Sequence, residues 1–324
     1  MKLNSMSNKV VVVGGGLGGL LSGAILAKEG FAVTLVEKNH RIGGSLQSYK
    51  RYGEVFDTGM HVSGGMQKNG NIYRICDYLG ILGDFKIAEI DKNVCYKVFI
   101  AEENKWYEVG QGKDGFTNSL SGYFPEERQN IENYLSEIYR IMHGSDLFNL
   151  RRLEHSLYDY SQDYSVSADQ LIEKYIKNRK LQSLIASVNT LYAGEKGISP
   201  SILHAAISMI FLNGACRVVD GYQHIANALG NCIKKYGGKI ITNNEVIRIQ
   251  TSGKIIKSIK TNKGLLIEAD YFISAISPVR MLDIIDNRHV FTNAYQSFIK
   301  DSADSYSAFI LNIKLKENIL RYSN

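Results

Sequence analysis

The sequence predicts an α/β fold in which a glycine-rich turn connects a buried parallel strand to a helix. Residues 10–13 are four consecutive valines, which is typical of a strand covered on both faces. The glycine-rich run 14–19 follows, and apolar residues at helical spacing then continue to Gly30, which ends the helix. A second apolar strand, 32–36, ends at Glu37 and completes a β–α–β unit. A cleaved signal peptide is not expected, because cleavage would leave the second strand without its partner.

The composition is that of a globular protein with room for about two domains. The 324 residues are 44% hydrophobic and 22% charged, which excludes a disordered chain. The net charge of +6 comes without a basic run, so no nucleic-acid partner is expected. The four cysteines are too sparse for a disulfide framework and indicate thiols in a reducing, cytoplasmic compartment. No further apolar run reaches the roughly 18 residues of a membrane-spanning helix.

The glycine turn has the spacing of a dinucleotide-binding site. Gly14 allows a tight turn out of the strand, Gly16 lets a pyrophosphate approach the backbone, and Gly19 lets the helix pack closely. The unpaired N–H groups and the dipole at the start of the helix attract phosphate. Glu37 ends the second strand, where a carboxylate can accept hydrogen bonds from both ribose hydroxyls. The turn, the helix and the acid together predict a bound dinucleotide.

A second glycine doublet favours FAD over NAD. Gly43 and Gly44 follow Glu37 closely, and the segment 52–59 comes after them. A plain NAD domain has no need of this doublet. The flavin end of FAD would run past it and would require a close approach to the backbone.

Residues 10–59 resemble the extended FAD fingerprint of the glutathione-reductase-type flavoproteins. The continuation 56–61, Phe-Asp-Thr-Gly-Met-His, with Gly64 and Gly65 after it, is similar to the branch that holds phytoene desaturases, carotenoid isomerases and retinol saturases. The resemblance implies that the backbone of Val246 lies against the adenine. The full set of expected cofactor-binding residues is Gly14, Gly16, Leu17, Gly18, Gly19, Glu37, Lys38, Gly43, Gly44, Ser45, Asp57, Gly59, Met60, His61 and Val246.

One position departs from the pattern of this family. Ser45 stands directly after the second glycine doublet, where many members carry Arg or Lys. Either Arg41 or Lys50 takes over that role, or the cofactor is held more weakly.

The resemblance implies an FAD-binding Rossmann domain of the glutathione-reductase type with a β-meander, into which an α+β substrate domain is inserted. The FAD-binding domain is expected over 1–95 and 216–285, and the substrate domain over 96–215 and 286–324. The family continues well past Asn324. The chain is therefore expected to match roughly the first two-thirds of a family member, with an incomplete substrate domain.

Helical periodicity dominates the middle of the chain, from about residue 110 to about residue 215. Pro125 opens one helix, and Ser167 with Gln170 forms a capping box for another. The tyrosines of this region either line a channel for a long hydrophobic substrate or lie half-buried in a helical domain. The apolar segment 202–212 is expected to be a core helix, with a membrane-dipping or substrate-tunnel segment as the alternative.

The chain is then expected to return to the cofactor domain. Residues 216–222 resemble the family segment that leads back to it. Turn residues separate the strands that follow, as in a meander. These expected strands are 239–242, 245–251, 254–261, 265–269 and 270–275, with a last alternating strand at 307–315.

The sequence offers little for acid–base, nucleophilic or metal chemistry. Its seven histidines show no metal-ligand spacing, and no serine or cysteine lies in a nucleophile motif. His61 is a weak catalytic candidate near the expected flavin ring, and a packing role is its alternative. Asp57 is interpreted as a structural or cofactor-side acid.

The resemblance implies an FAD-dependent oxidoreductase that acts on C–C bonds of a long conjugated polyene by hydride exchange with the flavin. Desaturation, saturation and isomerisation all stay open. The expected partner is a small hydrophobic substrate, which leaves room for peripheral contact with the inner face of a membrane. Two alternatives remain: an amine-oxidase-like flavoenzyme, and a truncated, catalytically incomplete FAD-binding fragment.

Overall fold

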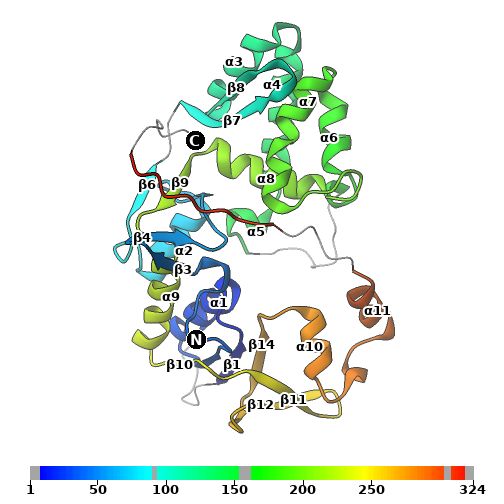
Figure 1. Cartoon of the computed structure of the whole chain (residues 1–324). Helices are drawn as coiled ribbons and strands as arrows, with labels where there is room; N and C mark the ends of the chain where they lie inside the picture. The colour runs from blue at the N-terminus through cyan, green and yellow to red at the C-terminus, as the bar shows by residue number, and fades with distance from the viewer. Residues whose placement is uncertain (1–7, 90–92, 153–161, 303–307, 318–324) are drawn as a thin grey trace. The chain divides into compact units, whose positions relative to one another are not determined.

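The computed structural model describes residues 8–89, 93–152, 162–302 and 308–317. The chain divides into two compact units, and each is built from separate stretches of sequence (Figure 1). The first unit comprises Met1–His61, Cys76–Lys86 and Val218–Asp304, and the second comprises Val62–Ile75, Ile87–Arg217 and Ser305–Asn324. Compared with the expected domain boundaries, residues 62–75, 87–95 and 216–217 lie in the second unit and residues 286–304 in the first.

A four-stranded parallel sheet forms the centre of the first unit, with strand order β10-β2-β1-β14. Its strands are β1 (Lys9–Val13), β2 (Ala32–Val36), β10 (Lys239–Ile241) and β14 (Tyr271–Ser274). Val10 pairs with Val33 on one side and with Tyr271 on the other. The four valines of β1 are at most 5% exposed, as expected of a parallel strand that is covered on both faces. The predicted β–α–β unit is confirmed.

Two helices of the first unit pack closely against each other. These are α1 (Leu17–Lys28) and α9 (Gln223–Lys235). Gly23 permits the contact, because a Cβ atom at this position would lie 3.0 Å from Cδ1 of Ile233. Helix α1 ends just before Gly30, whose φ of +91° suits only glycine well.

The predicted meander is present as a three-stranded antiparallel sheet. Its strands are β11 (Val246–Ser252), β12 (Ile255–Thr261) and β13 (Leu266–Glu268). Val246, Ile249 and Ile259 are buried in one apolar cluster with Val11 and Val13 of the parallel sheet. Strands β3 (Ser48–Arg51) and β4 (Glu54–Asp57) form a separate hairpin. Helices α10 (Pro278–Ile284) and α11 (Asn293–Asp301) follow β14 in the chain.

Helices are the main elements of the second unit. They are α2 (Asn71–Leu79), whose first half belongs here, α3 (Gly112–Tyr123), α4 (Arg128–His143), α5 (Asp146–Asn149), α6 (Ala168–Tyr175), α7 (Arg179–Ala186) and α8 (Ser201–Leu212). A hairpin of β7 (Val94–Ile100) and β8 (Lys105–Gly110) accompanies them. A small sheet has the strand order β5-β9-β6, formed by β5 (Ser63–Gly64), β9 (Ala215–Val218) and β6 (Ile87–Glu89). The expected helical region is confirmed.

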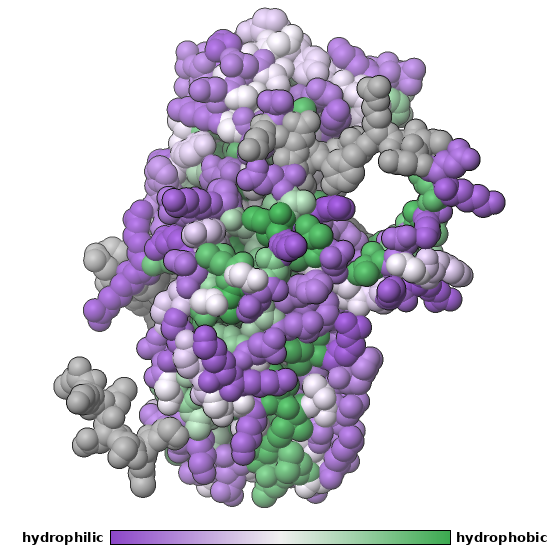
Figure 2. Space-filling model, turned by 90° about the vertical axis from the view of Figure 1, so that its left-hand side faces the viewer, coloured by the Kyte–Doolittle hydropathy of each residue, from purple (hydrophilic) through white to green (hydrophobic). Residues whose placement is uncertain are grey.

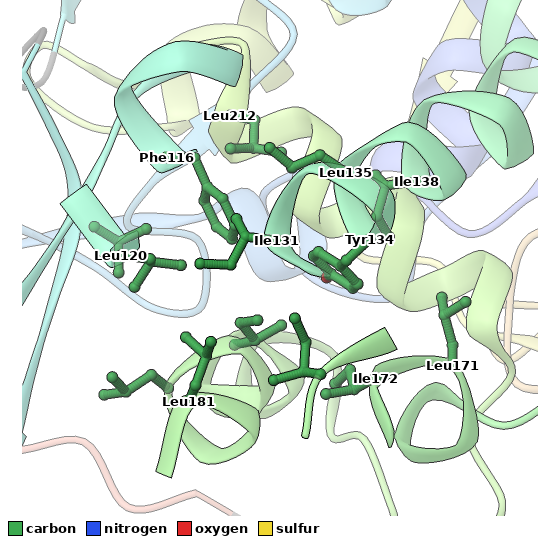
Figure 3. Packing of buried hydrophobic residues seen from close by; sticks show 14 of the residues in the cluster. Phe116, Leu120, Ile131, Tyr134, Leu135, Ile138, Leu171, Ile172, Leu181 and Leu212 are labelled. Atoms are coloured by element: carbon green, nitrogen blue, oxygen red, sulfur yellow. The ribbon is translucent and has the colours of Figure 1, made fainter. Parts of the chain in front are cut away.

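The core of the second unit lies between α3, α4, α6, α7 and α8 (Figure 3). The apolar face of α4 has the spacing of three and four residues expected of a helix and is at most 2% exposed along its whole length. It comprises Ile131, Tyr134, Leu135, Ile138, Ile141 and Met142. Helix α4 begins at Arg128, because Pro125–Glu127 forms a separate tighter turn. The predicted capping box of α6 is present, with the Ser167 side chain accepting the Gln170 N–H.

A buried histidine connects α4, α8 and the segment after α7. His204 is completely buried, with its Nδ1 2.7 Å from Oδ1 of Asn189 and its Nε2 2.6 Å from the Tyr134 hydroxyl. The Asn189 oxygen accepts, so Nδ1 carries the proton and Nε2 accepts from Tyr134. Burial lowers the pKa of His204 to about 4. Tyr134 is therefore a hydrogen-bonded core residue rather than part of a channel.

Two expectations are wrong. Residues 307–315 are predicted to form a strand, but the described part of this segment, 308–315, pairs with no sheet. Its apolar side chains are exposed, with Phe309 at 93% and Leu311 at 70%. Alternating apolar and polar residues are therefore not sufficient to form a strand here, because no neighbouring strand pairs with the segment. Leu191 lies in the region of helical periodicity, and its spacing from Leu184 and Val188 predicts a place on the same buried face. It is instead 58% exposed, because the chain forms a 3-10 turn over Ser187–Tyr192.

Among the residues that the structure describes, no helix combines the length and the apolar character that crossing a bilayer requires.

The buried neutral His204 predicts acid sensitivity in a defined pH window. Its pKa is about 4 in the folded chain against an ordinary 6.5, so the unfolded chain binds the proton first as the pH falls. The stabilisation is complete above pH 6.5 and is lost between pH 6.5 and 4. At roughly 1.4 kcal/mol for each pH unit, the loss is roughly 3 kcal/mol.

We expect His204→Gln to flatten the dependence of the melting temperature on pH between 6.5 and 4. The control is His289→Gln, which changes an exposed histidine and should keep the wild-type profile. Thermal unfolding followed by circular dichroism checks both variants. Parallel profiles for His204→Gln and wild type would show that this histidine does not cause the acid sensitivity.

Candidate nucleotide-binding site

A cavity of about 380 Å³ lies at the carboxyl ends of β1, β2 and β14, within the first unit. This is the edge of a parallel sheet at which ligands of α/β proteins bind. The residues that line it are Val13, Gly14, Gly15, Gly16, Val36, Glu37, Lys38, Asn39, Gly44, Asn244, Glu245, Val246, Ala275, Ile276, Ser277 and Arg280.

The glycine turn has the steric properties that the sequence predicts. Gly14 has a φ of +104°, and a Cβ atom there would lie 2.8 Å from the carbonyl oxygen of Ala275. A Cβ atom on Gly19 would collide with the carbonyl oxygen of Gly14. The position of a Cβ atom on Gly16 is open, with no atom within 4 Å. Gly14 and Gly19 therefore allow close packing, and Gly16 leaves bare backbone beside the cavity.

The start of α1 is available to an anion. Gly16 is its N-cap residue, and no side chain caps the helix. The N–H groups of the first turn have no carbonyl partner within the helix and carry the positive end of its dipole. A phosphate group next to Gly16 would accept hydrogen bonds from them.

Glu37 is held against the glycine turn by two backbone hydrogen bonds. Its Oε2 accepts the N–H of Gly15 at 2.7 Å, and its Oε1 accepts the N–H of Asn39 at 2.8 Å. The side chain is only 7% exposed, yet it lines the cavity. Each carboxylate oxygen can accept a further hydrogen bond, so Glu37 keeps capacity for two hydroxyl donors.

Gly15 is a site residue that sequence reasoning missed. A Cβ atom at this position would lie 3.0 Å from Oε2 of Glu37, so a larger residue would displace the carboxylate. The G-x-G-x-x-G pattern treats this position as variable, and only the three-dimensional contact shows the constraint.

The second glycine doublet packs directly on the first glycine turn. The N–H of Gly43 donates to the carbonyl oxygen of Gly15 at 2.7 Å. A Cβ atom on Gly44 would lie 3.0 Å from Cα of Gly16. Gly44 also lines the cavity, whereas Gly43 does not. The contact between the two backbone turns therefore requires the glycine doublet, independently of any contact with a flavin.

Asp57 ties two segments of the first unit together. Its Oδ1 accepts the Ser48 hydroxyl at 2.6 Å and the backbone N–H of Tyr222 at 2.9 Å. Gly221, with a φ of +99°, allows the close approach, because a Cβ atom there would lie 3.0 Å from Asp57 Oδ1. Asp57 does not line the cavity, so the structure gives it a structural role.

Arg41 and Lys50, which were expected to compensate for the missing arginine at position 45, do not line the cavity. Arg41 donates to the carbonyl oxygen of Ser48 and to Oε1 of Gln223, both at 3.1 Å. These bonds fix the loop between β2 and β3 to α9. Lys50 is an exposed residue of the β3–β4 hairpin.

The structure brings part of the predicted set together. Gly14, Gly16, Glu37, Lys38, Gly44 and Val246 line the cavity. The predicted residues that do not line it are Leu17, Gly18, Gly19, Gly43, Ser45, Asp57, Gly59, Met60 and His61. His61, the weak catalytic candidate, is exposed.

Residues from the last stretch of sequence in the first unit, Val218–Asp304, complete the cavity. Asn244 donates its backbone N–H to the carbonyl oxygen of Glu37 at 3.0 Å, next to the start of β11. Arg280, in α10, forms an ion pair of 3.0 Å with Glu245. In the sequence, Asn243–Asn244 and Ser277–Pro278 indicate only turns at the ends of expected strands. Their position next to Glu37 depends on strand pairing across the whole chain.

Burial removes two cysteines from consideration as nucleophiles. Burial raises the pKa of the Cys76 thiol to about 11 and that of the Cys95 thiol to about 12. Both therefore remain protonated at neutral pH, and a thiol is a poor nucleophile.

Comparison with known proteins matches residues 12–79 to the family of NAD(P)-binding Rossmann-like domains. The chain is 26% identical over 269 residues to prolycopene isomerase 1, chloroplastic, of an Oncidium hybrid cultivar, which covers 78% of this chain and 46% of that protein. It is also 26% identical over 288 residues to the 4,4'-diaponeurosporene oxygenase of Staphylococcus aureus, which covers 83% and 56%. The chain spans about half the length of these curated relatives.

Solved structures share the fold. An oxidoreductase from Methanosarcina mazei has a TM-score of 0.64 at 19% identity, covering 90% of this chain and 64% of its own. Putrescine oxidase bound to putrescine has a TM-score of 0.64 at 16% identity, covering 91% and 63%. These findings confirm the predicted α/β fold with a Rossmann-like domain. The sequence matches confirm the predicted resemblance to FAD-dependent carotenoid-modifying enzymes.

The contrast between Gly18 and Gly19 provides a test of the turn geometry. Gly19→Ala should lower the melting temperature strongly, because the new methyl group would collide with the Gly14 carbonyl oxygen. Gly18→Ala, one residue away, has no atom within 4 Å of its Cβ position. Alanine there should raise the stability of α1 by about 0.5–1 kcal/mol.

Thermal unfolding of both variants checks this prediction. Equal melting temperatures for the two variants would show that Gly19 does not hold the helix against the turn.

Proposed function

We propose that the chain binds FAD and acts as an oxidoreductase on C–C bonds of a long conjugated polyene. The cavity at the strand ends carries this proposal, because it joins the open Gly16 backbone, the uncapped start of α1 and the Glu37 carboxylate in one place.

The cavity fits the adenosine and phosphate part of a dinucleotide. Its volume of about 380 Å³ falls in the range of small-molecule pockets, which is about 300–1,000 Å³. Glu37 would accept hydrogen bonds from the ribose hydroxyls, and the first turn of α1 would bind the pyrophosphate. Val246, buried at the start of β11, would place its backbone against the adenine. A carboxylate at Glu37 repels a 2′-phosphate, which disfavours NADP.

When bound, the flavin supplies the redox chemistry by accepting or returning a hydride. An apolar polyene offers no acidic proton and no carbonyl group, so its oxidation does not require a general acid–base pair from the protein. The protein's own residues bind and orient the cofactor and exclude water. This division of roles agrees with the absence of a predicted acid–base pair in the sequence.

The substrate class comes from the curated relatives. Prolycopene isomerase and 4,4'-diaponeurosporene oxygenase are named for reactions on carotenoids, which are long conjugated polyenes. One is an isomerase and the other an oxygenase, so the similarity supports a polyene substrate and leaves the reaction type open. The shared fold of putrescine oxidase supports an amine-oxidase-like enzyme as the second candidate.

A hydrophobic substrate also suggests peripheral contact with a membrane, at its cytoplasmic face. Figure 2 shows one face on which apolar areas interrupt the polar surface. In the second unit, the exposed large apolar side chains of the segment 308–315 include Phe309 at 93%, Leu311 at 70% and Ile313 at 68%. Exposed aromatic and aliphatic groups of this kind favour a lipid interface.

Cofactor retention tests the role of Glu37. Glu37→Gln should weaken FAD binding at least tenfold, because the amide keeps the shape of the side chain but loses its charge-assisted hydrogen bonds, worth about 1.5–3 kcal/mol each. The measurement is a titration of the deflavinated protein with FAD, followed by flavin absorbance and fluorescence. The control is Glu268→Gln, an exposed acid of β13 that is outside the cavity. Equal affinity of wild type and Glu37→Gln would remove Glu37 from the ribose site.

The absorbance of the bound flavin tests the substrate class. Under anaerobic conditions, a carotenoid polyene should change the flavin absorbance or its own spectrum, and chromatography of the products distinguishes a desaturated, saturated or isomerised polyene. Putrescine is the comparison substrate. Flavin reduction by putrescine, with the polyene unchanged, would favour the amine-oxidase-like alternative.

A further inference from the structure

An ion pair between two segments far apart in the sequence lines the nucleotide cavity. Glu245 directly precedes β11, and Arg280 lies in α10. Nη2 of Arg280 lies 3.0 Å from Oε1 of Glu245, and both residues line the cavity within the first unit. Their side chains are 49% and 41% exposed, and ion pairs at such positions contribute little to stability. Either residue can therefore be changed with little effect on the fold, and the position of the pair bears on what the cavity binds.

The backbone of Glu245 is fixed beside the cavity. Its N–H donates to Oδ1 of Asn262 at 3.1 Å, and its carbonyl oxygen accepts the N–H of Asn262 at 2.8 Å. The preceding residue, Asn244, donates its backbone N–H to the carbonyl oxygen of Glu37 at 3.0 Å. The segment that carries Glu245 is thus bonded both to the meander and to the end of β2.

The other polar and apolar side chains near the start of β11 offer less to a base. Nδ2 of Asn244 donates to the carbonyl oxygen of Thr242 at 2.8 Å, and its Oδ1 accepts the Thr261 hydroxyl at 3.3 Å. The side chain of Val246 is buried in the apolar cluster of the first unit. Ser277 also lines the cavity, but a hydroxyl group both donates and accepts, so it does not discriminate between bases.

The ion pair keeps hydrogen-bonding capacity for a ligand. Among the described residues, the Glu245 carboxylate has no hydrogen bond other than the one from Arg280, so its Oε2 can accept another. The Arg280 guanidinium has five N–H donors, and the bond to Glu245 uses one of them. Glu245 and Arg280 therefore present an acceptor beside a donor, and their own bond sets the position of one relative to the other.

We propose that Glu245 and Arg280 select adenine as the base of the bound nucleotide. Adenine carries the N6 amino donor beside the N7 acceptor, whereas guanine carries two acceptors, O6 and N7. Glu245 would accept a hydrogen bond from N6, and Arg280 would donate one to N7. With guanine in the same place, the Glu245 carboxylate would face O6, and two acceptors repel each other. The proposal rests on the proposed function, because it takes the base to lie beside Val246.

Displacement of FAD from the full chain by ADP and by GDP tests the base preference. The chain is loaded with FAD and titrated with either nucleotide, and the released FAD is measured by its fluorescence after ultrafiltration. We expect ADP to displace FAD at a concentration at least tenfold lower than GDP, a difference of about 1.4 kcal/mol. Equal potency of the two nucleotides, or a preference for GDP, would overturn the proposal.

Three variants separate base selection from a structural role. Glu245→Ala should weaken ADP binding about tenfold and tighten GDP binding about threefold, because it leaves Arg280 free to donate to both O6 and N7. Arg280→Gln should weaken ADP binding about fivefold without any gain for GDP, because the carboxylate still faces O6. A structural role would weaken both nucleotides equally. The control is Asp283→Asn, which removes the acid of another ion pair of α10, 3.4 Å from Arg288 and outside the cavity, and which should bind like wild type.

The loading step distinguishes the failure of this proposal from that of the proposed function. If the wild type does not retain FAD, the proposed function is wrong, and isothermal titration calorimetry with ADP and GDP then measures the base preference directly. If FAD is retained and Glu245→Ala leaves the ratio of ADP to GDP affinity unchanged, the proposed function stands and the assignment of base selection to Glu245 and Arg280 is wrong.

Discussion

The first unit depends on the close contact of two backbone turns, one of which also binds the Glu37 carboxylate. Gly14 and Gly15 leave β1, Gly43 approaches from the loop after β2, and Glu37 binds the N–H of Gly15. The contact of Gly15 with Glu37 and that of Gly44 with Gly16 leave no room for a Cβ atom, because such an atom would lie 3.0 Å from Glu37 Oε2 or from Gly16 Cα. The same contacts that leave the cavity open to a nucleotide also fix the start of α1.

The sequence was a good guide wherever local chemistry decides the structure. The valine strand, the glycine turn, the apolar face of α4 and the Ser167–Gln170 capping box follow from spacing and hydrogen-bonding capacity within short segments. The nucleotide cavity was predictable on the side formed by residues 14–44. On its other side the resemblance implied only Val246. Asn244 and Arg280 were not predictable, because they reach the cavity only through the pairing of β10 with β2 and β14 with β1.

Some residues have a role in the structure that differs from the role expected from the motif. Asp57 and Arg41 belong to a stretch that suggests cofactor contact, yet both hold loops of the protein together. The His204–Asn189–Tyr134 cluster shows the opposite case, because no motif marks it. Its members are distant in the sequence, and burial alone turns an ordinary histidine into a neutral core residue.

The strand pairing of the first unit also affects how the chain is made. Strand β1 ends at Val13, but its neighbour β14 lies far along the chain and pairs Tyr271 with Val10. During synthesis, both edges of β1 are covered only after β14 has left the ribosome, because β2 covers one edge and β14 the other. Long-range parallel pairing of this kind is slow and leaves an unpaired, aggregation-prone strand edge exposed until the pairing is complete. One edge of strand β1 therefore stays uncovered until β14 has been made.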